Sequence, residues 1–471
     1  MADTKRLFGT DGVRGTAGHY PLDRATVRRL GAALVRAIRR DSGFVNRDSG
    51  RHSNPGSNPE SRVPNPVEFL VGRDTRESGT WIEAELAHGA SGDGAAVRSA
   101  GVVPTPAVAY LTRSGIYDAG VVISASHNPY EDNGIKVFSG KGEKFTEAVE
   151  REVEAIVADT SWTPKGGDAK PLATDDLVGP YVDHLRAVFP DASSTLKNFR
   201  LAVDCANGAT TGVARRLFES LGFDAHYIGD QPDGRNINLH CGSTHPELLA
   251  RTVVEHGCNM GVAFDGDGDR AIFVDHRGRI VDGDAVLLMC GRQMQREQRL
   301  KGNALVATVM SNIGLELALQ RLGIALVRCS VRDKYVMEEM LKRDLSLGGE
   351  QSGHIIFSEY LFTGDGLCTA LNVLRTIAAS GRSLADLAGD LTTYPQILLN
   401  VRVREKVDLQ TVPTVAAAIE RVEARLDGQG RLLVRYSGTE PLLRVMIEGQ
   451  DPDAIRAWAQ EIVDVVQEHL G

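Results

Sequence analysis

Two serines and a histidine stand where a buried strand is expected to end. In residues 119–138 an apolar run closes at Ile123, which predicts the end of a buried strand, and Ser-Ala-Ser-His-Asn-Pro follows at once. The hydroxyls of Ser124 and Ser126 therefore lie just past a strand's carboxyl end, where open α/β sheets bind ligands. A serine turn that only ends the strand is the alternative. Serine is a weak nucleophile, so phosphoryl transfer here requires a metal ion and a base within reach.

Three aspartates supply the metal ligands that this chemistry requires. Asp265, Asp267 and Asp269 alternate with glycines between two apolar segments. Carboxylates this close repel one another unless a cation lies among them, and glycine permits the tight backbone path on which they converge. Ligation by oxygen alone favours a hard cation, and Mg²⁺ is the usual companion of phosphate. An EF-hand is excluded, because Arg270 and His276 stand where that loop requires Gly and Glu.

A third polar loop carries groups suited to a sugar. Glu350, Ser352 and His354 alternate, so in an extended conformation they point to one side. An acid, a hydroxyl and an imidazole on one face suit recognition of sugar hydroxyls and proton transfer. A structural histidine beside a strand is the alternative.

The C-terminal segment contains a candidate phosphate cradle. Arg435-Tyr-Ser-Gly-Thr predicts a strand that runs into a turn, where a guanidinium, hydroxyls and free backbone N–H groups converge. The cradle residues are Arg435, Ser437, Gly438 and Thr439, with Arg444 on the next strand. No Gly-x-x-x-x-Gly-Lys precedes the turn, so it is not a Walker A loop.

Positive charge is expected from two positions in the N-terminal part. Arg14 lies among glycines in residues 8–15, a pattern that suits close approach to an anion, although an ordinary surface turn fits equally well. Lys136 lies on the strand returning from the serine loop and supplies charge, or acts as a base if burial lowers its pKa. Arg73 and Arg76 follow another predicted strand and either face a ligand or form a solvated turn, and the solvated turn is the favoured interpretation.

Alternating strands and helices must position these groups, which predicts an α/β fold. An amphipathic helix is expected over residues 24–40. Ser-, Asn- and Pro-rich residues 41–66 predict a flexible insertion without a chemical role. The other expected elements are a helix over 81–92, a strand over 324–331, a helix-capping turn at 363–366, a strand over 396–403 and a helix over 412–426.

Composition narrows the class of protein. The 471 residues exceed one hydrophobic core, so two to four domains are expected. A net charge of −9 disfavours nucleic-acid binding, so anions must be held by locally gathered cations. Six scattered cysteines predict small core residues in a reducing compartment. No apolar leader or membrane-length run is present, so we expect a cytoplasmic protein without membrane partners.

Taken together, these motifs resemble those of the α-D-phosphohexomutases, and in particular the bacterial phosphoglucosamine mutases. The matching stretches occur in family order and span nearly the whole chain: 8–15, 124–138, 265–270, 348–354 and 435–441. The resemblance implies four domains around a central cleft, three of them related α/β domains and the last an α+β phosphate-binding domain. The expected ranges are 1–178 with the serine loop, 179–280 with the metal loop, 281–392 with the sugar loop and 393–471 with the phosphate loop.

The resemblance also implies a reaction. The enzyme would be an isomerase that interconverts glucosamine 6-phosphate and glucosamine 1-phosphate through a phosphoserine and a 1,6-bisphosphate. A catalytic amount of glucosamine 1,6-bisphosphate or glucose 1,6-bisphosphate would activate it, and its product would supply amino sugar for cell-wall precursors. Its partner would be a phosphorylated hexosamine, and whether the chain forms a homodimer stays open.

Residue roles carry over from the family pattern. Ser126 would hold the phosphate, and Mg²⁺ would be bound by the phosphoserine and the three aspartates. Proton transfer and charge stabilisation would fall to Arg14, His127, Lys136 and His354. Sugar and distal phosphate would be held by Thr10, Arg270, Glu350, Ser352, Arg435, Ser437, Gly438, Thr439 and Arg444.

Alternatives and departures remain at this stage. Within the superfamily the alternative is a phosphomannomutase/phosphoglucomutase. Outside the superfamily there are two alternatives. The chain is an aspartyl-phosphate phosphatase with Asp265 as its nucleophile, or it is a protein that binds sugar phosphates without catalysis. Arg332 stands where the family usually has Gly, which would strain the loop if that position requires a positive φ, or narrow the cleft if it lies close to the ligand.

Overall fold

The computed structural model describes residues 6–9, 12–40, 66–437 and 440–471. The chain forms two compact units: unit 1 comprises residues 1–310 and 325–388, and unit 2 comprises 311–324 and 389–471. Thr10, Gly438, Thr439 and residues 41–65 of the predicted insertion at 41–66 lie outside the described residues.

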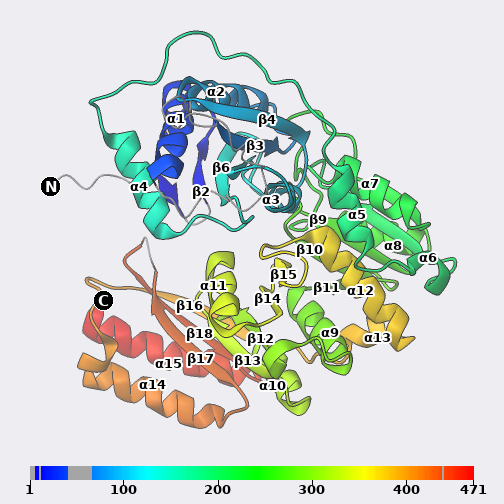
Figure 1. Ribbon diagram of the computed structural model, residues 1–471. Helices are drawn as coiled ribbons and strands as arrows, with labels where there is room; N and C mark the ends of the chain where they lie inside the picture. Colours follow the sequence, from blue (N-terminus) through cyan, green and yellow to red (C-terminus); the bar gives the residue numbers. More distant parts are fainter. Residues whose placement is uncertain (1–5, 10–11, 41–65, 438–439) are drawn as a thin grey trace. The chain divides into compact units, whose positions relative to one another are not determined.

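Unit 1 contains three mixed sheets (Figure 1). The first has the order β1-β2-β6-β5-β3-β4, the second β11-β10-β9-β7-β8 and the third β13-β12-β14-β15. The strands of the first sheet are β1 (Phe8–Gly9), β2 (Gly12–Thr16), β3 (Val67–Arg73), β4 (Ala95–Val102), β5 (Ala119–Ile123) and β6 (Asp132–Ser139). The second sheet has β7 (Arg200–Asp204), β8 (Asp224–Ile228), β9 (Met260–Phe264), β10 (Ala271–Asp275) and β11 (Ile280–Val281). The third has β12 (Ala304–Thr308), β13 (Ala325–Cys329), β14 (Leu347–Gly349) and β15 (Ile355–Phe357).

The three sheets repeat one pattern of pairing. In each, the first strand of a parallel trio (β3, β7 or β12) lies in the middle, and the third strand (β5, β9 or β14) pairs with an antiparallel return strand. The turns to the return strands are residues 124–131, 265–270 and 350–354. The three polar loops singled out in the sequence therefore occupy the same topological position, at the carboxyl end of a parallel strand.

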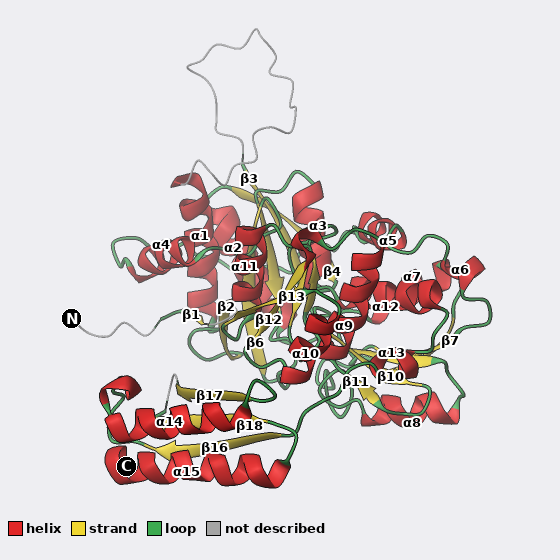
Figure 2. Ribbon diagram, turned by 90° about the horizontal axis from the view of Figure 1, so that it is seen from below, coloured by secondary structure: helices red, strands yellow, loops and turns green. Residues whose placement is uncertain are grey.

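Alternation along the buried strands explains the layers of the first sheet. Phe69 and Val71 pack into a core with apolar residues of helices α1 (Arg24–Arg40), α2 (Gly79–Gly92) and α4 (Glu147–Ala158). Gly72 and Gly120 lie on the other face, where a Cβ would meet Val108 of α3 (Thr105–Ser114). Helices therefore cover both faces, as the side-chain period of two requires (Figure 2).

The remaining helices of unit 1 accompany the second and third sheets. They are α5 (Gly179–Arg186), α6 (Ala192–Thr195), α7 (Thr211–Ser220), α8 (Glu247–Glu255), α9 (Gly283–Arg296), α11 (Asp333–Arg343), α12 (Gly366–Ser380) and α13 (Leu384–Ala388). The expected helix-capping turn is confirmed, since the Asp365 side chain accepts from the backbone N–H of Cys368 at the start of α12. All six cysteines are buried and free, as predicted.

Unit 2 is a three-stranded antiparallel sheet with helices on one face. The sheet has the order β16-β18-β17, formed by β16 (Gln396–Arg402), β17 (Arg431–Tyr436) and β18 (Leu442–Glu448). Alternate residues of all three strands form a core with α14 (Pro413–Leu426) and α15 (Pro452–Leu470). Buried Glu448 accepts from Ile313 N and Asn312 Nδ2, which ties the start of α10 (Ile313–Arg321) to this unit.

The secondary-structure predictions are largely confirmed at these positions, with ends displaced by one to a few residues. Within the described residues, every helix is too short or too polar to span a bilayer.

Candidate active site

The serine loop is bent by an unusual backbone conformation at Ser126. This residue has φ = 54°, in the left-handed region, and its side chain is almost wholly buried. Its N–H donates to Ser124 Oγ at 2.9 Å, and its own Oγ donates to Asp265 Oδ2 at 2.5 Å. The structure thus brings the predicted nucleophile into direct contact with the predicted metal loop, although they are far apart in the sequence.

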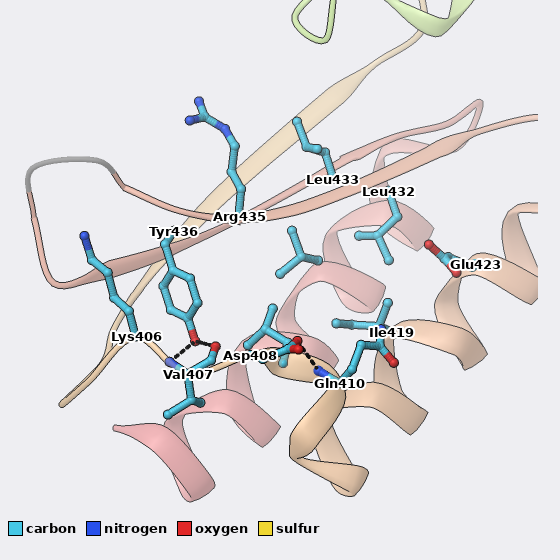
Figure 3. Close-up of a pocket in the computed structure, with 12 residues that line it drawn as sticks. Lys406, Val407, Asp408, Gln410, Ile419, Glu423, Leu432, Leu433, Arg435 and Tyr436 are labelled. Atoms are coloured by element: carbon cyan, nitrogen blue, oxygen red, sulfur yellow. Dashed lines mark hydrogen bonds between the residues drawn. The ribbon is translucent and has the colours of Figure 1, made fainter. Parts of the chain in front are cut away.

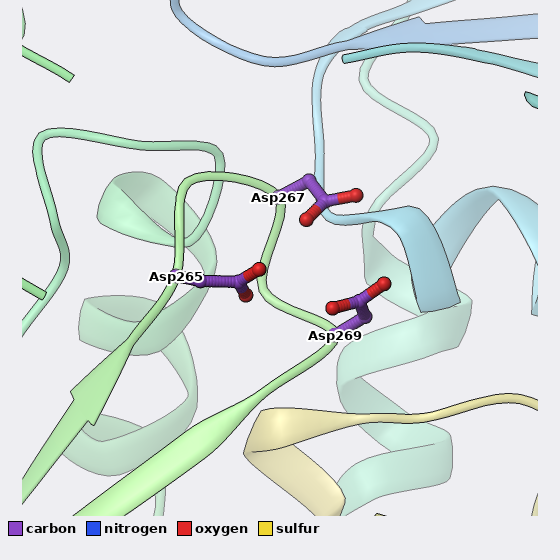
Figure 4. Close-up of side chains that lie close together, drawn as sticks. All are labelled: Asp265, Asp267 and Asp269. Atoms are coloured by element: carbon purple, nitrogen blue, oxygen red, sulfur yellow. The ribbon is translucent and has the colours of Figure 1, made fainter. Parts of the chain in front are cut away.

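The three aspartates converge as the alternating glycines predicted. One oxygen from each of Asp265, Asp267 and Asp269 lies within 4.8 Å of the others (Figure 4). All three side chains are buried, and the Oδ1 atoms of Asp267 and Asp269 have no hydrogen-bond partner among the described residues. Buried, unpartnered carboxylate oxygens facing one another fit a hard divalent cation.

Lys136 contacts two of the three aspartates, and the pKa values of Asp265 and Asp267 differ as a result. Its Nζ donates to Asp267 Oδ2 at 2.8 Å and to Asp269 Oδ2 at 3.2 Å. Burial raises the pKa of Asp265 well above its ordinary value, and the neighbouring Asp269 and Asp267 raise it further. Burial acts in the same sense on Asp267, but the Lys136 ammonium, together with hydrogen bonds from Lys136, Thr105 and Asp265, holds the pKa of Asp267 low. The carboxyl whose pKa is raised is therefore the one that faces Ser126.

Glycine is required where the serine and metal loops meet. A Cβ on Gly266 would lie 2.5 Å from the carbonyl oxygen of Ser126 and 2.8 Å from Asn238 Nδ2. A Cβ on Gly268 would lie 2.5 Å from Thr210 Cγ2. The glycines between the aspartates therefore permit both the tight turn and the close packing of the two loops.

His127 and Arg14 flank the serine loop. His127 Nδ1 lies 3.4 Å from Ser126 Oγ. Burial lowers the pKa of His127 to about 4, with Arg270 and Arg14 adding to the shift, so this imidazole is neutral near pH 7. Arg14 lies on β2 opposite Gly134, in a strand that pairs with β6. The site therefore offers a neutral imidazole and a nearby guanidinium.

The extended conformation expected for residues 350–354 is wrong. Gly353 has φ = 89° and its N–H donates to Glu350 O at 3.0 Å, so the segment forms a tight turn between β14 and β15. Glu350 and Ser352 stay together, with 3.4 Å between Ser352 Oγ and Glu350 Oε2, whereas His354 turns into the interior. Alternation in sequence imitates a strand here, but glycine permits the turn.

His354 still reaches the metal loop, through the backbone and not along a strand face. It forms a β-bridge with Arg270, the residue after the last aspartate. Its ring is buried, with Nε2 3.6 Å from Asp333 Oδ2, and a Cβ on Gly364 would lie 2.3 Å from that ring. The predicted sugar loop and metal loop are therefore neighbours in unit 1.

In unit 2, the described cradle residues lie together. Arg435 on β17 and Arg444 on β18 are direct cross-strand partners, and Ser437 is buried at the end of β17. Figure 3 shows Arg435 leaving β17 on the side opposite Tyr436, whose hydroxyl exchanges hydrogen bonds with Val407 on the helix side. The depression of about 630 Å³ drawn there is lined by residues 406–410, 419, 423 and 432–436.

Four residues of the site were not identified from the sequence: Asp74, Arg76, Thr105 and Asn238. Arg76 is fully buried beside Asp74 and donates to Ser126 O at 3.2 Å, so the prediction of a solvated turn is wrong. Asn238 donates to the same carbonyl at 2.9 Å, and Thr105 Oγ1 donates to Asp267 Oδ2 at 2.6 Å. The one signal in the sequence was an Asp-Thr-Arg run directly after an apolar strand.

Arg332, which stands where the family usually has Gly, adopts a backbone conformation that favours glycine. Its φ is 151°, in the region that favours glycine, directly before α11. Its guanidinium remains near the surface, 3.4 Å from the Tyr335 hydroxyl. A backbone strain of about 1–3 kcal/mol is expected at such a position.

Family models match the chain in four consecutive segments. They are the phosphoglucomutase/phosphomannomutase alpha/beta/alpha domains I (residues 61–163), II (179–278) and III (282–394), followed by the C-terminal domain (398–465).

Individual relatives agree with that match. The chain is 48% identical to the phosphoglucosamine mutase of Solibacter usitatus (strain Ellin6076), over 99% of both chains. A phosphoglucomutase/phosphomannomutase family protein from Burkholderia thailandensis has a similar fold, with a TM-score of 0.76, 22% identity, and 98% and 97% of the two chains covered. Aspergillus fumigatus N-acetylphosphoglucosamine mutase, solved with GlcNAc-6P and magnesium, gives a TM-score of 0.60 at 20% identity, covering 87% of this chain and 84% of that one.

Proposed function

The chain belongs to the phosphoglucosamine mutases of the α-D-phosphohexomutase superfamily, and from that premise we propose how its residues divide the work. The enzyme is an isomerase that moves a phosphate between the 6- and 1-positions of glucosamine. The observation that carries the residue assignment is the 2.5 Å contact between Ser126 Oγ and Asp265 Oδ2, at the edge of the three converging carboxylates.

Ser126 is the phosphate carrier. The phosphoserine gives its phosphoryl group to the free 1-hydroxyl of the 6-phosphosugar, which forms a 1,6-bisphosphate and leaves the serine hydroxyl. The bisphosphate then presents its other end, and Ser126 takes the 6-phosphate to release the 1-phosphate. Phosphate is conserved, and one proton passes from the attacking hydroxyl to the leaving oxygen in each half-reaction.

The metal site is assigned to Asp265, Asp267, Asp269 and the phosphoserine. Mg²⁺ fits this set because every donor is an oxygen, and it supplies charge neutralisation at the transferring phosphoryl group. A cation among the carboxylates would lower the pKa of Asp265, which burial and the neighbouring Asp269 and Asp267 raise.

Four other residues act on protons and charge. His127 is neutral near pH 7 and 3.4 Å from Ser126 Oγ, so it accepts a proton during exchange at that oxygen. Lys136 and Arg14 balance the anionic groups around the serine loop. His354, buried beside Asp333, completes the set on the side of the sugar loop.

Substrate contacts are proposed on the three loops and in unit 2. Glu350 and Ser352 hold sugar hydroxyls, and Arg270 holds a phosphate oxygen. The distal phosphate is held by Arg435, Ser437, Gly438, Thr439 and Arg444, with Thr10 assisting at the N-terminal loop. Domain ranges of 1–178, 179–280, 281–392 and 393–471, a cytoplasmic location and activation by a 1,6-bisphosphate belong to the same proposal.

A mutase assay tests the assignment. Wild type and Ser126→Ala are compared with Mg²⁺, a catalytic amount of bisphosphosugar and the 6-phosphates of glucosamine, glucose and mannose. We expect preference for glucosamine in the wild type, and loss of both turnover and the stable phosphoprotein in Ser126→Ala. Retained activity would favour Asp265 as nucleophile, and preference for glucose or mannose would favour the phosphomannomutase/phosphoglucomutase alternative.

A further inference from the structure

The carbonyl oxygen of Ser126 is held from outside its own loop. Asn238 Nδ2 donates to it at 2.9 Å and Arg76 Nη2 at 3.2 Å. The same two side chains donate to Asn128 O, at 3.2 Å from Asn238 and 2.6 Å from Arg76. Two donors from distant parts of the sequence therefore grip both ends of the segment 126–128.

The Arg76 donor belongs to a closed ring of buried polar groups. Arg76 is ion-paired with Asp74, and Asp74 accepts from the hydroxyl of Ser124. Ser124 Oγ in turn accepts from the N–H of Ser126. Both sides of Ser126 are thus tied into one network, its N–H through Ser124 and its C=O through Arg76.

The Asn238 donor is positioned by a second buried carboxyl. Asn238 has φ = 58°, and its N–H donates to Ala206 O at 2.8 Å. Asp204 accepts from Ala206 N at 2.9 Å and from Gly242 N at 2.7 Å. It thereby anchors the turn that accepts from Asn238 and the turn that follows Asn238 in the chain. The amide therefore reaches Ser126 from a preorganised loop.

We propose that Asn238 and Arg76 are positioning residues for phosphoryl transfer: they hold the left-handed backbone of Ser126 so that Oγ faces the aspartate trio. This inference rests on the proposed function, because it presumes that Ser126 Oγ carries the phosphate. Within the described part of unit 1, neither side chain hydrogen-bonds to Ser126 Oγ or to the trio. A left-handed serine is intrinsically unfavourable, so release of its carbonyl lets the residue relax and turns Oγ away.

Asn238→Asp is the sharpest probe. Aspartate has the same shape and also tolerates the left-handed region, but it replaces the amide donor with an acceptor that repels the Ser126 carbonyl. Asn236→Asp is the matched control, since it makes the same chemical change in the same loop and its Nδ2 donates only to Gln231 O in that loop, at 2.9 Å.

The measurement compares kcat, KM, melting temperature and the rate at which glucose 1,6-bisphosphate phosphorylates the dephosphorylated enzyme, followed by intact mass. For Asn238→Asp we expect kcat and the phosphorylation rate to fall together by about 10- to 100-fold, with KM within about twofold of wild type, because misplacement of a reacting group acts on the transition state. Asn236→Asp should match wild type. Arg76→Lys keeps the charge beside Asp74 but loses the planar fork, and it should show the same split if Asn238→Asp does not fold.

Equal kcat in the two Asp variants, or a fall in kcat matched by a fall in melting temperature in Asn238→Asp and Arg76→Lys alike, would overturn the inference. Ser126→Ala separates this failure from the larger one. An active Ser126→Ala enzyme would reject the proposed role of Ser126 as phosphate carrier, whereas an inactive one beside an unaffected Asn238→Asp would reject only the positioning role.

Discussion

The aspartate trio in unit 1 and the arginine pair in unit 2 differ in how far their charges are buried and in the charges that lie beside them. Asp265, Asp267 and Asp269 are buried, and Lys136 lies within 3.2 Å of two of them. Arg435 and Arg444 are half-buried, stand directly opposite each other and have the same sign, and Glu440 Oε2 lies 3.6 Å from Arg444 Nη2. They lie on the face of their sheet away from α14 and α15, because the alternate residues on both strands form the helix-packed core.

This difference matches two different tasks. Phosphoryl transfer gains most from groups already oriented in a dry site, where no reorganisation is needed during the reaction. Anchoring a phosphate requires cations whose charge is still available to the ligand. Like charges placed opposite each other are mildly destabilising until an anion arrives between them. Under the proposed assignment, the trio in unit 1 serves the rate of phosphoryl transfer, and the arginine pair of unit 2 serves affinity for the phosphate.

Asp267→Asn is expected to cause the largest loss of activity among the variants that test this comparison. The change removes a ligand of the proposed cation and the closer partner of Lys136, so we expect kcat to fall by on the order of 10³-fold or more. Mg²⁺ affinity, measured by titration calorimetry, should fall with it. Asp275→Asn is a suitable control, because Asp275 is a buried aspartate at the end of β10 that is paired with Arg279 instead. An active, metal-tight Asp267→Asn enzyme would contradict the assignment of the trio.

Gly266→Ala should damage the same centre without altering any charge. Its Cβ would lie 2.5 Å from the Ser126 carbonyl, so the serine and metal loops must separate. We expect kcat to fall by about 10²-fold and unfolding to be easier by about 1–3 kcal/mol. Gly212→Ala offers a control, because nothing lies within 4 Å of a Cβ there. Activity and urea unfolding of the two variants decide the question, and a Gly266→Ala enzyme that behaves like Gly212→Ala would show that the loops are not in contact.

Local patterns were sufficient to predict the parts of the site that lie within one loop. Alternating Asp and Gly between apolar segments predicted convergence of the trio, because glycine permits the tight backbone path that such a turn requires. The polar run after Ile123 predicted the position of Ser126 at a strand end. These predictions depended on the end of a strand and on the residues that follow it.

Contacts between distant segments were beyond local patterns. Nothing near Arg76 in the sequence indicates that positions 76, 126 and 238 meet, so a buried ion pair was interpreted as a solvated turn. The turn at Gly353 was missed for another reason: alternation of Glu350, Ser352 and His354 has the period of a strand, and only the backbone of Gly353 distinguishes the two. The depressed pKa of His127 likewise depends on burial and on Arg270, which the fold brings near.

The buried carboxyl of Asp204, beside the active centre, should make the free energy of unfolding depend on pH. Burial raises the pKa of Asp204 to about 6, against an ordinary value near 3.8. The folded state therefore binds more protons between these values, and this carboxyl makes the protein less stable as pH rises through that window. Between about pH 4.5 and about pH 7.5, wild type should lose about 2 kcal/mol relative to Asp204→Asn. Urea unfolding of both proteins at several pH values measures the difference, in which other titrating groups cancel. A difference independent of pH would show that Asp204 is not held in a dry site.

Arg435→Gln should give the smallest effect on stability and the clearest contrast with unit 1. Removing one of two opposed arginines relieves repulsion, so we expect unit 2 to become more stable by about 0.5 kcal/mol in the absence of ligand. KM should rise by about tenfold while kcat changes little, because the lost contact acts on ground state and transition state alike. Arg402→Gln is the control, since Arg402 is exposed on the same sheet and stands opposite Leu442, not a cation. Fluorescence of Trp458, on α15, reports unit 2 in a background without Trp81 and Trp162. A fall in kcat with unchanged KM would place Arg435 with the groups that work on the transition state, and the division between the two units would then be wrong.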